Sequence, residues 1–108
     1  MYTIEEIQQK IAPIAKAHNL KAVWLIGSYA RGEATENSDI DFLYDRAGSL
    51  ITSIIKASSM YIDVKELFNV SVDMVCLQAL QQSRTPKITE SFVRSIEKDK
   101  VLLYERGN

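Results

Sequence analysis

The chain has 108 residues, of which 46% are hydrophobic and 25% charged, and its formal net charge is −1. This length predicts one domain over residues 1–108, and the composition excludes a disordered or fibrous chain. The small net charge and the pI of about 5.8 argue against an extended nucleic-acid surface, so a small ligand or a protein partner is expected instead.

The first predicted element is a helix that runs to about His18. Thr3 can cap its start, and Glu6 stands three residues later, as a capping box requires. Apolar residues follow at helical spacing. Pro13 lies inside the segment and predicts a kink or a division, and Asn19 supplies a stop signal.

A strand, a short helix and a second strand are predicted next. Residues 22–26 form a continuous apolar run that ends at Gly27, which is typical of a strand covered on both faces. Residues 28–33 predict a short helix. A turn signal over 36–38 then leads into a second strand over 39–44, whose first residues alternate between polar and apolar.

The remaining sequence predicts three more helices and two more strands. They are a long helix over residues 49–68, a strand over 70–75, a short helix around Ala79, a helix over about 87–98 after the break at Pro86, and an edge strand over 101–104. The element order predicts an α+β domain, close to α/β, with helices packed on one small mixed sheet. The long helix is predicted to face the core through Leu50, Ile51, Ile54, Ile55, Ala57, Ser58, Ile62 and Leu67.

Two aspartates stand at the start of the second predicted strand. Residues two apart on a strand point to the same face, so Asp39 and Asp41 place two carboxylates side by side. Neighbouring anions repel unless a cation lies between them, and magnesium prefers carboxylates together with substrate phosphates. An isolated Asp-x-Asp is more often a turn cap followed by a solvated residue, and this alternative stands for the pair alone.

A glycine and a serine follow the first predicted strand. Gly27 permits a tight turn, and Ser28 opens a helix whose unpaired N–H groups would suit a phosphate. Gly-Ser is also a common turn, and Ser28 could simply cap its own helix. A third carboxylate, Asp73, lies within an apolar run, where burial would require a partner or a metal. Its alternative is a solvent-facing residue of an alternating strand.

These segments together resemble a known family. Gly27-Ser28, ten intervening residues and Asp39-Ile40-Asp41 resemble the signature of the DNA polymerase β-like nucleotidyltransferase superfamily. The fuller strings Gly-Ser-Tyr-Ala-Arg-Gly and Ser-Asp-Ile-Asp-Phe resemble its smallest members, the MNT proteins, which pair as antitoxins with HEPN toxins. The similarity covers most of the chain, and it implies the nucleotidyltransferase fold. Because 108 residues leave no room for a second domain, another molecule is expected to supply the acceptor.

The resemblance also implies roles for individual residues. Gly27 and Ser28 would hold the triphosphate of ATP. Arg31 could reach a phosphate, with an exposed salt bridge as an equally good alternative. The implied chemistry is in-line attack on the α-phosphate with loss of pyrophosphate, promoted by two magnesium ions. The implied magnesium ligands and catalytic residues are Asp39, Asp41 and Asp73, of which the last would help to activate the acceptor hydroxyl.

The sequence therefore predicts a magnesium-dependent enzyme that transfers AMP from ATP to a hydroxyl of a partner protein. The expected partner is a HEPN toxin, which the antitoxin inactivates and with which it could form a hetero-oligomer. Two alternatives stay open: an antitoxin that only binds and occludes the toxin, and a catalytic subunit that modifies a small molecule or RNA held by a separate chain. Cys76 is the only cysteine, and no leader or apolar span of roughly 20 residues is present, so a cytoplasmic location without membrane contact is expected.

Overall fold

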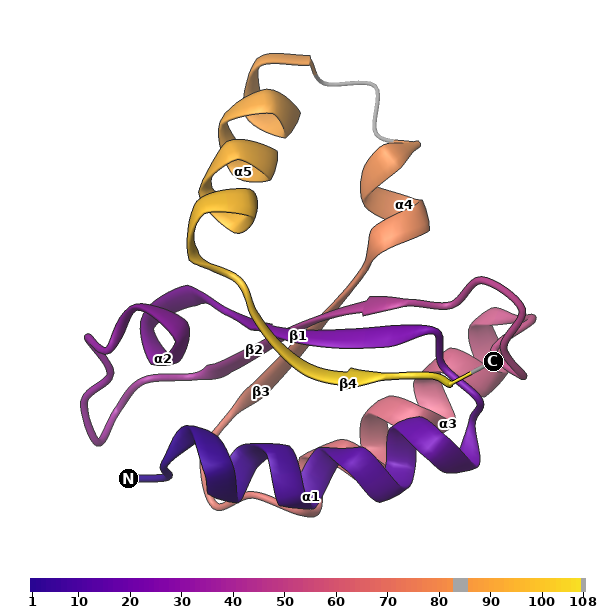
Figure 1. Ribbon diagram of the computed structural model, residues 1–108, viewed down its shortest axis with the longest axis horizontal. Coiled ribbons are helices and arrows are strands. Elements are labelled where there is room, and N and C mark those ends of the chain that lie inside the picture. Colours follow the sequence, from indigo (N-terminus) through magenta and orange to yellow (C-terminus); the bar gives the residue numbers. More distant parts are fainter. Residues whose placement is uncertain (83–85, 108) are drawn as a thin grey trace.

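A mixed four-stranded sheet is the centre of the fold (Figure 1). A computed structural model describes residues 1–82 and 86–107, with side chains described for 1–82 and 90–107. The strand order is β3-β2-β1-β4; β1 pairs antiparallel with β2 and with β4, whereas β2 and β3 run parallel. The mixed sheet and the edge position of the last strand are as predicted. The strands are β1 (Ala22–Ile26), β2 (Ile40–Asp45), β3 (Val72–Cys76) and β4 (Val101–Glu105).

Helices lie on both faces of this sheet. In Figure 1, α1 and α3 cover one face, α4 and α5 rise from the other, and α2 lies beyond the end of β1. None of the helices in the described ranges is long and apolar enough to cross a membrane. The helices are α1 (Ile4–Ala17), α2 (Gly27–Arg31), α3 (Ile54–Lys65), α4 (Leu77–Gln81) and α5 (Pro86–Asp99).

The ends of α1 follow local sequence signals. The N–H of Thr3 donates to Oε1 of Glu6 at 2.9 Å, and the N–H of Glu6 donates to Oγ1 of Thr3 at 3.1 Å, so the predicted capping box is confirmed. His18 is the C-cap, and Asn19 follows with a φ of 54°. The helix runs through Pro13 without the predicted division.

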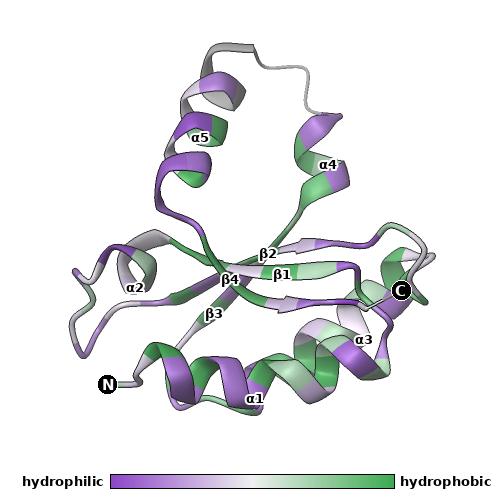
Figure 2. Cartoon of the chain, in the orientation of Figure 1, coloured by the Kyte–Doolittle hydropathy of each residue, from purple (hydrophilic) through white to green (hydrophobic). Residues whose placement is uncertain are grey.

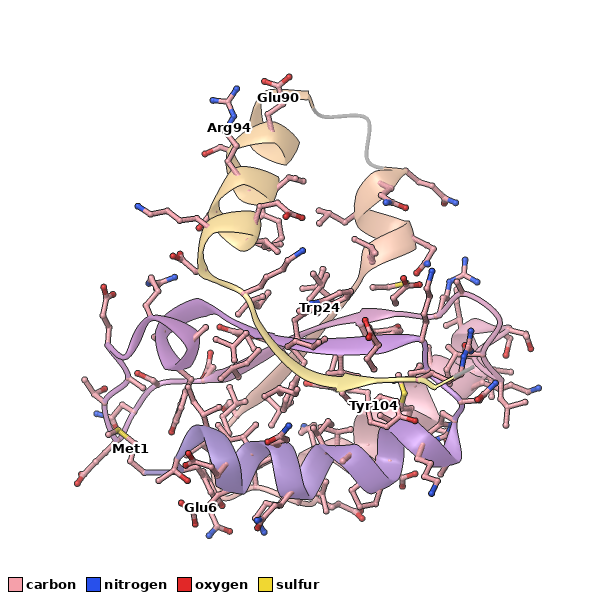
Figure 3. All side chains as sticks on the ribbon, in the orientation of Figure 1. Met1, Glu6, Trp24, Glu90, Arg94 and Tyr104 are labelled. Carbon is pink, nitrogen blue, oxygen red and sulfur yellow. The ribbon has the colours of Figure 1, made fainter. Side chains whose placement is uncertain are left out.

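Strand alternation divides the apolar residues between two clusters. In β2, Phe42 packs towards α1 and α3 in the larger cluster, whereas the next residue, Leu43, packs with Ile26 and with Ile96 of α5 in the smaller one. Trp24 joins the smaller cluster on the sheet face that carries α5 (Figure 3), where the Lys100 ammonium lies 5.1 Å from the centroid of its ring. The apolar run in β1 is therefore covered on both faces, as predicted (Figure 2).

The prediction for α3 was wrong in length and in orientation. The helix begins only at Ile54, because Ser53 caps it by accepting from the N–H of Lys56, and residues 49–53 form a non-helical segment. This shorter helix buries Met60 and Val64, which are four residues apart. Five members of the predicted inner stripe are instead exposed: Leu50, Ile54, Ile55, Ser58 and Ile62.

Candidate functional site

The parallel pair β2–β3 brings two of the predicted carboxylates together. Asp41 and Asp73 are direct register partners. Their neighbours in the register, Ile40 and Val72, point into the core beneath the sheet. Since successive strand residues alternate, both aspartates point to the face that carries α5, on strands about 4.8 Å apart. The strand pairing thus brings together two residues that lie 32 positions apart in the sequence.

Gly27 lies directly against Asp41. It follows Ile26, which pairs with Asp41 across β1 and β2, and its φ is +75°. A Cβ atom at this position would collide with Oδ2 of Asp41 and would stand 3.3 Å from its Cγ atom. Only glycine therefore allows both the left-handed backbone and the close approach of this carboxylate. The need for a glycine here was predicted, but on account of a phosphate rather than a carboxylate.

The charges around Asp41 oppose its ionisation. Its pKa is raised, first because burial penalises the carboxylate and then because the charges of Asp73 and Asp39 repel it. Arg31 acts in the opposite direction. Three carboxylates are therefore close enough to interact through their charges, and a bound cation would relieve that repulsion.

The three carboxylates do not form a ready-made metal cluster. Within the described residues, no three histidine, cysteine, aspartate or glutamate side chains are arranged so that they could hold an ion. Asp39 precedes β2, whereas the prediction placed it inside the strand. Asp39 and Asp73 are both exposed, and for Asp73 this agrees with the alternative of a solvent-facing residue on an alternating strand. The donor chemistry fits magnesium, and Asp41 with Asp73 is the part of the set that the sheet holds in register.

A different aspartate on the same strand has a structural role. Asp45 is buried, and its Oδ1 accepts from Nε2 of Gln78 at 2.6 Å and from the N–H of Ala47 at 3.0 Å. Both bonds satisfy the buried carboxylate within the fold. Asp45 therefore lies on the same face as Asp41 but is engaged in joining β2 to α4.

Ser28 and Arg31 lie on α2, the short helix that begins at Gly27. No side-chain hydrogen bond caps α2, so the structure gives no support to the alternative that Ser28 caps this helix. Nε of Arg31 lies 3.2 Å from Oε2 of Glu33, and its Nη1 lies 3.7 Å from Oδ2 of Asp99. The salt bridge that stood as the alternative for Arg31 is thus present, and its contact with Asp99 links α2 to the end of α5.

A cavity of about 420 Å³ opens beside these residues. Five residues of its lining come from the predicted site or the strand that leads to it, and the others come from the rest of β3 and from α5. The helix α5 was predicted, but its contribution to the site was not, because only the tertiary arrangement shows which surface its apolar side covers. The lining residues are Ile26, Gly27, Arg31, Asp41, Asp73, Met74, Val75, Phe92, Ser95 and Ile96.

The chain is similar to nucleotidyltransferases in sequence and in fold. A family model described as "Polymerase beta, Nucleotidyltransferase" matches residues 9–108. Protein adenylyltransferase MntA of Thermococcus cleftensis is 31% identical over 85 residues, which cover 75% of this chain and 84% of that protein. A relative from Methanocaldococcus jannaschii is 32% identical over 77 residues, covering 71% of this chain and 81% of its own length.

The fold comparison agrees with the sequence comparison. A crystal structure described as a toxin–antitoxin with AMP-PNP matches 92% of this chain and 73% of its own chain, with a TM-score of 0.67 and 20% identity. At this identity the likeness shows a shared fold. Together with the family match over residues 9–108, it establishes that the chain belongs to the polymerase beta nucleotidyltransferase family and is a nucleotidyltransferase.

Proposed function

We propose that this chain transfers AMP from ATP to a hydroxyl of a partner protein. The observation that carries the proposal is the register pair of Asp41 and Asp73, which lies beside Gly27 in an open cavity. Such a pair suits phosphoryl chemistry, which depends on positioning and charge neutralisation. The similarity to a protein named as a protein adenylyltransferase supports AMP as the transferred group and a protein as its acceptor.

Magnesium would be held by Asp39, Asp41 and Asp73. When bound, it neutralises charge on the triphosphate and on the attacking oxygen. The proposal is supported by the raised pKa of Asp41, which burial and the two neighbouring aspartates cause. Because the three carboxylates are not converged in the described structure, and the sheet holds Asp41 and Asp73 in register, Asp39 would be the one to move into place.

The chain's own residues would position the reacting groups. Gly27 lets Asp41 approach the backbone, Ser28 would donate its hydroxyl to a phosphate oxygen, and Arg31 would contact a phosphate from the cavity wall. The acceptor oxygen attacks the α-phosphorus, the bond from that phosphorus to the bridging oxygen breaks, and pyrophosphate leaves. The carboxylate of Asp73 would receive the proton of the acceptor hydroxyl.

The partner we propose is a HEPN toxin that AMP transfer inactivates in the cytoplasm, within a hetero-oligomer of toxin and antitoxin. The fold similarity to a toxin–antitoxin structure with AMP-PNP supports a toxin partner and a nucleotide ligand. A separate protein is then the natural source of the hydroxyl.

The test is the mass of the partner recovered from cells. The chain is expressed with the product of the neighbouring reading frame, as wild type, as Asp73→Asn, and as Asp63→Asn. Asp63 is exposed on α3 and supplies a matched control outside the site. We expect increments of one or more AMP units with wild type and Asp63→Asn, and none with Asp73→Asn. Full protection by Asp73→Asn in a stable complex with an unmodified toxin would establish occlusion instead.

A further inference from the structure

The strand that carries Asp73 has an open edge. β3 is the last strand of the sheet on its side, and the described residues place no strand beyond it. Ile40 is the register partner of Val72, and its N–H donates to the carbonyl of Ser71 at 2.9 Å. In a parallel ladder, the backbone groups of every second residue form hydrogen bonds to the same neighbouring strand. The backbone groups of Asp73 therefore face β2, and those of Val72 and Met74 face outward.

Only part of this outward edge is occupied within the described structure. The hydroxyl of Tyr61, on α3, donates to the carbonyl of Val72 at 2.7 Å, which agrees with an outward direction for this carbonyl. The N–H and C=O of Met74, two residues further, have no strand beside them in the part of the chain that the structure describes. Such an edge can receive an additional extended segment.

An apolar groove runs along the same edge. It consists of two cavities of about 270 Å³ and 440 Å³ that share Tyr44, Ile54 and Ala57. We call this the β3–α3 groove. Burial raises the pKa of Tyr44 to about 12, so its hydroxyl stays neutral and cannot act as a base at physiological pH. Ile54 has an exposed fraction of 84%, which leaves a large apolar side chain uncovered at the rim of the groove.

The groove leads directly to the candidate site. Asp73 and Met74 line both the smaller groove cavity and the cavity beside Gly27. Because β2 separates β3 from β1 in the sheet, a group entering along the outer edge of β3 would reach Asp73 from the side away from Gly27. A nucleotide and an acceptor could thus approach Asp73 from opposite sides.

The far end of the groove carries a positive charge. Arg46 lines the larger cavity, and the ion pairs found among the described residues involve Arg31 and Lys100 rather than Arg46. A segment bound along the groove would therefore complement this charge if it carried an acidic residue at the Arg46 end. Its hydroxyl side chain would lie at the Asp73 end, and its apolar side chains between the two.

We propose that the β3–α3 groove binds an extended segment of the acceptor protein, which pairs with the open edge of β3 and presents its hydroxyl to Asp73. This inference rests on the proposed function, since it assigns the acceptor surface of the same site. The segment adds backbone hydrogen bonds to Met74 and places apolar side chains against Ile54, the combination by which extended peptides are recognised at sheet edges.

Two neighbouring isoleucines allow a matched test. Ile54 and Ile55 are exposed by 84% and 81%, but only Ile54 lines the groove cavities. The variants Ile54→Glu and Ile55→Glu are assayed for AMP transfer to the product of the neighbouring reading frame, with AMP-PNP binding as the second readout. We expect Ile54→Glu to raise the KM for the acceptor about tenfold or more, Ile55→Glu to resemble wild type, and AMP-PNP affinity to be unchanged in both.

Hydrogen exchange of the Met74 amide tests the strand pairing without a substitution. In the complex with the acceptor protein, its exchange should slow about a hundredfold relative to the free chain. Equal transfer by both isoleucine variants, or unchanged Met74 exchange in a formed complex, would overturn the groove proposal alone. A free chain that is dimeric as wild type and monomeric as Ile54→Glu would assign the groove to a second copy instead. Absence of any labelled protein with wild type would overturn the proposed function, and this inference with it.

Discussion

Replacing Gly27 with alanine should separate folding from catalysis. A left-handed backbone at alanine costs about 1–2 kcal/mol, and Gly27 has a φ of +75°. The new methyl group would in addition meet the Asp41 carboxyl, whose Cγ would lie 3.3 Å away, and such overpacking typically costs about 1–3 kcal/mol. The sum of roughly 2–5 kcal/mol is less than the total stability of most domains, about 5–15 kcal/mol, so most of the protein should stay folded.

The chain offers a matched control in Gly32. Its φ is +74°, but no atom lies within 4 Å of the Cβ that alanine would add. Gly32→Ala therefore carries the same backbone penalty without moving a carboxylate. Each kcal/mol lowers Tm by about 4–8 °C in a domain of this size, so Gly32→Ala should lower Tm by roughly 4–16 °C and Gly27→Ala by more.

Transfer of AMP provides the decisive assay. A displacement of a catalytic group by about 1 Å can lower the rate about 100-fold, so Gly27→Ala should lose at least that much kcat below its melting range. Gly32→Ala should stay close to the wild-type rate at the same temperature. If both variants melt alike and transfer AMP alike, then Gly27 does not position Asp41 for the reaction, and the argument from this close contact fails.

Three further predictions concern the carboxylates and the serine. Asp39→Asn combined with Asp41→Asn should abolish magnesium-dependent transfer without loss of thermal stability, because it removes repulsion; wild-type transfer would refute the metal assignment. Since the pKa of Asp41 is raised in the folded chain by burial and by its two acidic neighbours, the folded state holds this proton to higher pH than the unfolded state does. Wild type should therefore lose stability relative to Asp41→Asn as pH rises from the ordinary carboxyl pKa through the raised one, measured as the difference in Tm without magnesium. Ser28→Ala should weaken binding of AMP-PNP more than it lowers Tm, and equal binding would reduce Ser28 to a turn residue.

The parts of the fold that the sequence predicted well are set by local spacing. The capping box of Thr3 and Glu6 needs only three residues to close, and it formed with both hydrogen bonds. The strand over 22–26 and the turn at Gly27 were likewise predictable, because an apolar run and the glycine that ends it are neighbours in the chain. The order of helices and strands followed from the same kind of signal.

The parts that could not be predicted depend on contacts between distant segments. Nothing in the residues alone shows that β3 pairs with β2 so that Asp73 stands opposite Asp41; the resemblance to a family implied a shared site, and the structure supplied the register. The same holds for Phe92 and Ser95, which line the cavity from α5. The sequence predicted a helix over about residues 87–98, but a helix prediction does not show which surface of the sheet the helix covers.

The error in α3 and the β3–α3 groove have one physical cause. The apolar residues of this segment were expected to face the chain's own sheet, and the helix instead buries Met60 and Val64 while Ile54 and Ile55 stay in solvent. Apolar periodicity shows that a helix has an apolar side that must be shielded from water. It does not show whether the protein's own core or a binding partner shields that side. The exposure of Ile54 beside an open strand edge that leads to the candidate site is better explained by a partner that is absent from the isolated chain. Of the residues that misled the core prediction, Ile54 is thus the one to mutate first when the acceptor surface is sought.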